Sequence, residues 1–217
     1  MATPPLRGCT HTSTKHRASP PLIRCAFASL MACASLVLPG CSYFSGEGPL
    51  TTQSVDADFD LLLEPGIRAY RSTDPNTADI YLTDLPRELC QPGASLGEAS
   101  GQLLHIHLFI SPEAGETPIE STACSVSIRL VVISRGQVGV YGGGGFLYPD
   151  SDLGDEDFEG SIRRGTLKYM NGTPGFADRL GPSELSGDIE APKDEAAVRI
   201  LAARLDELLG MTRKPAP

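Results

Sequence analysis

The chain has few basic residues beyond its first forty positions. Residues 1–40 hold four of the 18 basic residues and none of the 27 acidic ones, which leaves a net charge of −13 on the remainder. Because nucleic-acid phosphates need Lys or Arg for neutralisation, this shortage excludes a nucleic-acid partner. It also argues against electrostatic docking on anionic lipid.

The chain also lacks an apolar run long enough to cross a bilayer. Its most apolar stretch, "CAFASLMACASLVL" (25–38), has 14 residues without a charge and follows Arg24. A spanning helix needs about 20 such residues. A short apolar segment with basic residues before it and small residues after it is typical of an export signal. Residues 1–40 are therefore predicted to be a signal peptide.

The junction "LPGC" (38–41) resembles the lipobox of bacterial lipoproteins, in which an aliphatic residue and two further positions precede the cysteine that is acylated. The resemblance implies cleavage after Gly40, a diacylglyceryl group on Cys41, and a lipid bilayer as partner. Ser42 follows in place of Asp, which in Gram-negative lipoproteins implies the outer membrane. A single acyl chain anchors only marginally, so several chains are expected.

Beyond the junction, residues 41–60 are polar and without periodicity, which predicts a flexible tether. Short apolar runs then alternate with Gly, Pro and Asp clusters, a pattern typical of many strands. Strands do not alternate with helices, which argues against a parallel sheet. Strands are predicted at 78–85, 102–110, 123–134, 137–149, 160–170 and 184–190, with a tight turn at Arg135–Gly136.

Two of these strands alternate apolar and other residues. Because alternate residues of a strand share one side, each apolar row should face a core. The first row is Leu104, Ile106, Leu108 and Ile110, and the second is Cys124, Val126, Ile128, Leu130 and Val132.

One helix is predicted, at 194–209, from apolar residues three and four apart. Asp194 can cap its first turn and Gly210 can end it. The fold class is therefore mainly β, an antiparallel sandwich or curved sheet closed by one C-terminal amphipathic helix. It forms a single domain over 61–210, followed by a tail at 211–217.

Cys90 and Cys124 are the cysteines that remain after removal of the leader and acylation of Cys41. An even pair in an oxidising compartment predicts a disulfide. Closing a loop of about 35 residues would stabilise the fold by about 4 kcal/mol in the chain-entropy model. Two free thiols are the alternative.

The motif "HIH" places His105 and His107 on one side of a strand, roughly 6.6 Å apart. Two such histidines could share a metal ion. Since no other histidine follows residue 40, further ligands must be carboxylates, and Glu113 is the nearest downstream. The alternative is a surface or packed histidine pair without an ion.

An acidic segment at 150–160 is a candidate calcium loop, because hard cations prefer dense oxygen ligands. EF-hand spacing fails, since its sixth position is acidic in place of glycine. A mobile, solvated loop is the alternative. The candidate ligands are Asp150, Asp152, Asp155 and Asp157.

Four glycines at 142–145 lie between Tyr141, Phe146 and Tyr148. They form no phosphate cradle, since neither Lys-Ser/Thr nor a helix follows. Glycine inside a strand marks a bulge or a close backbone approach. Aromatic faces beside bare backbone could alternatively bind sugar or peptide.

"GASLG" (93–97) matches the nucleophile elbow of hydrolases at Ser95, but the required strand-to-helix context is missing. We therefore expect a non-catalytic envelope domain without a cofactor, which binds an envelope protein or a glycan. The alternative is a metal-dependent hydrolase or metal-binding protein that uses His105 and His107.

Overall fold

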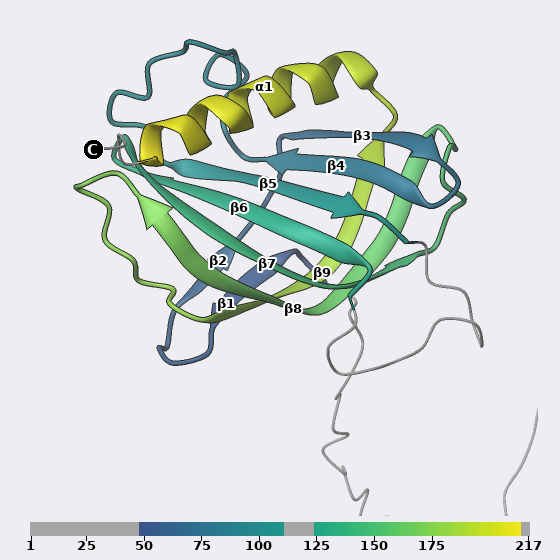
Figure 1. The fold of residues 1–217 in the computed structure, drawn as a ribbon, viewed down its shortest axis with the longest axis horizontal. Coiled ribbons are helices and arrows are strands. Elements are labelled where there is room, and N and C mark those ends of the chain that lie inside the picture. Colours follow the sequence, from purple (N-terminus) through teal and green to yellow (C-terminus); the bar gives the residue numbers. More distant parts are fainter. Residues whose placement is uncertain (1–47, 111–123, 214–217) are drawn as a thin grey trace, which may run out of the picture. The chain divides into compact units, whose positions relative to one another are not determined.

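The computed structural model describes residues 48–110 and 124–213. These residues form one antiparallel sheet and one helix (Figure 1). Along the sheet the strand order is β2-β1-β9-β8-β7-β6-β5-β4-β3. The elements are β1 (Thr51–Ser54), β2 (Asp60–Leu62), β3 (Ile67–Asp74), β4 (Thr77–Thr83), β5 (Gly101–Leu108), β6 (Val126–Ser134), β7 (Gln137–Pro149), β8 (Asp157–Gly172), β9 (Ser183–Pro192) and α1 (Glu195–Thr212).

The prediction of a curved antiparallel sheet is confirmed. The sheet curls so far that its edge strand β3 returns to the end of β9, where Tyr70 and Lys193 form a single parallel bridge. The backbone N–H of Asp194 also donates to the Tyr70 carbonyl at 3.1 Å. A salt bridge of 3.3 Å joins Arg68 to Glu190 at the same seam.

The glycine run of β7 allows this curvature. A side chain at Gly143 would overlap the Thr166 carbonyl of β8, so the two strands approach too closely there for any Cβ. The register between β7 and β8 shifts within Gly144–Phe146, and that between β8 and β9 shifts within Ile162–Gly165. Bulges of this kind bend a sheet and increase its twist. The predicted bulge is therefore confirmed.

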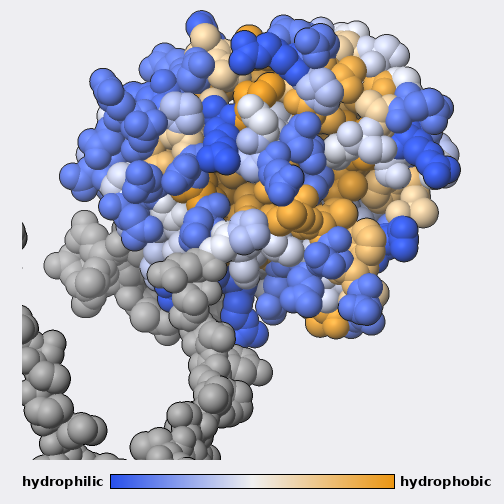
Figure 2. All heavy atoms as spheres, turned by 180° about the vertical axis from the view of Figure 1, so that it is seen from behind, coloured by the Kyte–Doolittle hydropathy of each residue, from blue (hydrophilic) through white to orange (hydrophobic). Residues whose placement is uncertain are grey.

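The concave face of the sheet, here called the inner face, holds the larger apolar cluster. Leu104, Ile106 and Leu108 of β5 are fully buried there, beside Val126, Ile128 and Leu130 of β6. Both predicted rows thus face a core, except at their ends: Ile110 is 50% exposed and Cys124 is exposed. Figure 2 shows the molecule from behind the view of Figure 1, and apolar residues reach the surface there between hydrophilic ones.

The other face, here called the outer face, carries α1 (Figure 1). The buried helix residues Val198, Leu201, Leu205 and Leu208 pack on Leu103, Val131 and Ile133 of the sheet. The predicted cap is confirmed, because the Asp194 carboxylate accepts from the Ala196 and Ala197 N–H groups at 3.0 and 2.9 Å.

Two predicted boundaries are wrong. Gly210 does not end α1, which continues to Thr212, whose hydroxyl lies 3.0 Å from the amide oxygen of Asn171. The tether over 41–60 is structured from residue 48 on, since β1 pairs with β9 and β2. The polar β1 is held by side-chain bonds that periodicity does not reveal: the Ser54 hydroxyl donates to the Leu180 carbonyl at 2.6 Å. Positions 41–47 and 214–217 lie outside the described residues.

Candidate functional site

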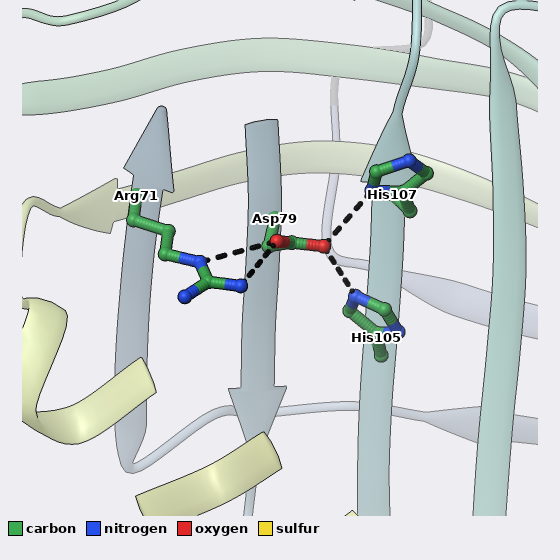
Figure 3. Close-up of polar contacts among 4 residues, drawn as sticks. All are labelled: Arg71, Asp79, His105 and His107. Atoms are coloured by element: carbon green, nitrogen blue, oxygen red, sulfur yellow. Dashed lines mark hydrogen bonds and ion pairs between the residues drawn. The ribbon is translucent and has the colours of Figure 1, made fainter. Parts of the chain in front are cut away.

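Four polar side chains meet on the outer face (Figure 3). Arg71 of β3 lies opposite Asp79 of β4, and Asp79 lies opposite His107 of β5. His105 is two residues before His107 and therefore shares its side of the strand. These four residues are called the Asp79 cluster below.

Asp79 is the centre of the cluster. Its Oδ1 lies 3.0 Å from His105 Nε2 and 2.9 Å from His107 Nδ1. Its Oδ2 accepts from Nε and Nη2 of Arg71 at 3.2 and 3.0 Å. Both carboxylate oxygens are therefore in use, and the side chain is only 13% exposed.

The hydrogen bond with His105 is the largest cause that holds the pKa of Asp79 well below its usual range, and those with His107 and Arg71 act in the same direction. Burial opposes them. Asp79 is thus a carboxylate at neutral pH. The ring of Tyr81 stacks on His105 with 4.4 Å between ring centroids, and burial, followed by the charge of Asp79, raises the pKa of Tyr81 to about 12.

Sequence reasoning found the two histidines but not Asp79. The structure confirms that His105 and His107 share a face opposite the buried Leu104 row. The partner strand 78–85 was predicted as well. Pairing it with β5 places Asp79 against His107 only in the register that the structure shows. The missing information was the register between the two strands.

Two of the predicted metal ligands, His105 and His107, lie among the described residues. Within the described ranges 48–110 and 124–213, no three His, Cys, Asp or Glu side chains are placed to hold a metal ion. Glu113 lies outside the described residues. In the Asp79 cluster the imidazole nitrogens contact the carboxylate directly.

The predicted calcium ligands also stay apart. Asp150, Asp152 and Asp155 are exposed in the connection between β7 and β8, and Asp157 begins β8. Backbone bonds shape this connection, since the Asp150 N–H donates to the Glu159 carbonyl at 2.8 Å and the hydroxyl of Tyr70 donates to the Asp155 carbonyl.

Of the three aromatic residues predicted to form a ligand surface, Tyr141 is not accessible. Tyr141 is buried on the inner face, where its hydroxyl donates to Asp178 Oδ1 at 2.6 Å. Phe146 and Tyr148 remain nearer the surface and stack with 6.3 Å between centroids. The guanidinium carbon of Arg163 lies 5.7 Å from the Tyr148 ring centroid.

The predicted disulfide is not formed, since Cys90 is a buried and Cys124 an exposed free thiol. Cys90 contacts Leu85, which lies against Gly101 at the first residue of β5. Cys124 is two residues from Val126, which pairs with Leu108 at the other end of β5. Seven strand steps span about 23 Å, whereas disulfide-bonded Cα atoms lie within about 7 Å.

Ser95 is exposed in the connection between β4 and β5. The chain passes from this connection into β5 without an intervening helix. The strand-to-helix turn that a nucleophile elbow requires is therefore absent at Ser95, as the sequence indicated.

A groove lies next to the Asp79 cluster on the outer face. Arg129 of β6, Gly142 of β7 and Lys168 of β8 are direct neighbours across three strands, and Arg129 also lies opposite His105. The groove has a volume of about 540 Å³ and is called the glycine groove below. Its lining residues are Ser127, Ile128, Arg129, Val140, Tyr141, Gly142, Gly143, Lys168, Met170, Asn171, Leu209 and Arg213.

Among the described residues, three cations and no carboxylate line the glycine groove. Arg129 and Lys168 come from the sheet, and Arg213 follows the last residue of α1. Within the part of the chain that the structure describes, none of the three forms an ion pair. All three side chains are exposed and therefore available to a ligand.

Comparison with known proteins finds no family model, no curated protein and no solved structure that matches the chain. Among residues 48–110 and 124–213, no helix is both long and apolar enough to cross a membrane.

Proposed function

We propose that the chain is an envelope lipoprotein, anchored through acylated Cys41, whose β-rich domain binds a ligand on its outer face without transforming it. The observation that carries the binding role is the glycine groove. It is open and lies beside α1. It gathers three cations that form no ion pair with any residue the structure describes, in a chain whose net charge is −9.

The anchoring role is supported by the "LPGC" junction, with the outer membrane as destination. Gly48, seven positions after Cys41, is already held by the domain, because its N–H donates to the Asp188 carboxylate at 2.8 Å. Seven residues span at most about 25 Å. The domain would therefore stay close to the bilayer surface, much closer than a tether reaching residue 60 would allow.

Asp79 itself is not placed to act as a general base. A general base needs a lone pair directed at a substrate proton. Both oxygens of Asp79 instead contact His105, His107 and Arg71. The contacts of the cluster link the side chains of β3, β4 and β5 and hold them in place beside the groove.

The anchor is tested by expressing the full chain in a bacterial host and partitioning the product between detergent and aqueous phases. Wild type should enter the detergent phase and take up labelled fatty acid. Cys41→Ser should lose the label and move to the aqueous phase. Equal partitioning of the two proteins would contradict the anchor.

Metal binding through His105 and His107, or metal-dependent hydrolysis, is the second candidate, because Asp79 supplies a carboxylate beside both rings. Zinc titration by calorimetry separates the two functions. We expect no tight binding, since the ring nitrogens facing Asp79 are already hydrogen-bonded. Tight binding that disappears in Asp79→Asn and in His105→Ala/His107→Ala would replace the present proposal.

A further inference from the structure

Neighbouring backbone explains three of the four consecutive glycines of β7. An added Cβ would overlap the Thr166 carbonyl at Gly143, approach the Val126 carbonyl to 2.7 Å at Gly144, and approach the Gly165 Cα to 2.7 Å at Gly145. Real Cβ atoms essentially never come so close, and backbone cannot move away cheaply. These three positions therefore require glycine for the fold.

Gly142 is different. An added Cβ there would meet only the flexible side chain of Met170, at 3.2 Å from its Cγ. Gly142 is not among the glycines with a positive φ, so its backbone conformation does not require glycine either. The fold thus does not demand glycine at this position. The missing side chain at Gly142 leaves the floor of the glycine groove open.

Cations flank this open floor. Arg129 and Lys168 lie directly on either side of Gly142, on the part of the outer face that α1 leaves uncovered. Two strand spacings place their backbones roughly 10 Å apart, so both side chains can reach one group held above Gly142. Arg213 approaches from the end of α1.

Gathering like charges costs free energy unless an anion offsets their repulsion. A guanidinium can hold a carboxylate or a phosphate through two parallel hydrogen bonds, and an ammonium adds a point charge. Val140, Met170 and Leu209 add an apolar wall. A volume of about 540 Å³ lies in the range of small-molecule sites.

We propose that the glycine groove binds a small organic anion, with its carboxylate or phosphate held over Gly142 between Arg129 and Lys168 and its uncharged body against Met170 and Leu209. This inference rests on the proposed binding function and names its ligand class. The anionic group could belong to a soluble sugar acid or sugar phosphate, or to a phospholipid headgroup.

The test uses the full chain, purified in a neutral detergent, and isothermal titration at low salt. Glucuronate represents a sugar acid, glucose 6-phosphate a sugar phosphate, and glycerol 3-phosphate a lipid headgroup. We expect saturable binding of at least one probe, weakened towards about 1 M salt, where the Debye length is about 3 Å. The tightest probe identifies the source.

Variants locate the site. Arg129→Gln and Lys168→Gln should each weaken binding about tenfold or more, since each removes a charge-assisted contact. Gly142→Val should abolish it by filling the floor. Arg135→Gln is the matched control, because it removes one exposed charge at the β6–β7 turn, and it should bind like wild type.

Thermal unfolding of each variant separates loss of the site from loss of the fold. If Gly142→Val does not fold, Gly142→Ala, which needs only a small shift of Met170, takes its place. No binding of any probe by wild type, or equal binding by wild type and the groove variants, would overturn the inference. Detergent partitioning of the same samples reports the anchor separately, so the two proposals can fail independently.

Discussion

At the scale of single residues, Asp79 shows how a buried charge is maintained. It joins Arg71 on one neighbouring strand to His105 and His107 on the other. A carboxylate of this low exposure is tolerated because both of its oxygens have hydrogen-bond partners and one partner is a guanidinium. Removing the charge should therefore cost more than removing an exposed one.

Asp79→Asn should lower the free energy of unfolding by about 2 kcal/mol at neutral pH. The folded-state pKa of Asp79 lies far below its usual range, so the folded form binds fewer protons than the unfolded form. The stabilisation is then complete above the unfolded pKa of about 3.9 and decreases as the pH falls below it towards the folded pKa.

Urea unfolding at a series of pH values checks this expectation. Wild type and Asp79→Asn should differ most near neutral pH, and their curves should converge in acid. Asp152→Asn, an exposed change in the β7–β8 connection, is the control and should match wild type throughout. A constant difference between wild type and Asp79→Asn down to strong acid would contradict the assignment.

The two thiols should differ sharply in reactivity. Cys90 is 2% exposed, and burial raises the pKa of its thiol, whereas Cys124 is exposed. Because the thiolate is the reactive species, a maleimide should label Cys124 in the native protein and Cys90 only after unfolding. Peptide mass spectrometry without reduction reads both sites, and a linked Cys90–Cys124 pair would refute the structure at this point.

At the scale of elements, the sequence predicts what repeats along the chain. The strands of the middle of the sheet and α1 were predictable because their apolar residues recur at periods of two or of three to four. β1 and β3 were not, since β1 is polar and β3 alternates weakly. Their place depends on partners distant in the sequence, as Ser54 does on Leu180.

Gly210 offers a test of α1. Since the helix continues through it to Thr212 and nothing lies within 4 Å of an added Cβ, Gly210→Ala should stabilise the protein by about 0.5–1 kcal/mol. Asp194→Ala, which removes the cap, should destabilise it by about 1 kcal/mol. Thermal unfolding measures both, and a destabilising Gly210→Ala would mean that α1 ends before residue 210.

At the scale of the whole molecule, the curl of the sheet determines both cores and the candidate site. The inner face closes around one apolar cluster, while α1 covers only part of the outer face. The Asp79 cluster and the glycine groove occupy the part that remains. The two histidines were readable from "HIH", but the groove was not, because it requires the register of β6, β7 and β8 together.

Two adjacent glycines of β7 have different roles: Gly143 allows the sheet to bend, and Gly142 forms the floor of the groove. Substituting each of them tests this difference. Gly143→Ala would overlap the Thr166 carbonyl, so the sheet must open at its bend, and the variant should lose about 3 kcal/mol or more of unfolding free energy. Gly142→Ala, one residue away, meets only Met170 and should change stability by less than about 1 kcal/mol. Urea unfolding of this adjacent pair compares the same chemical change on opposite faces of one strand. Equal costs at the two positions would mean that Gly142 also serves the fold, and the groove would lose its distinguishing feature.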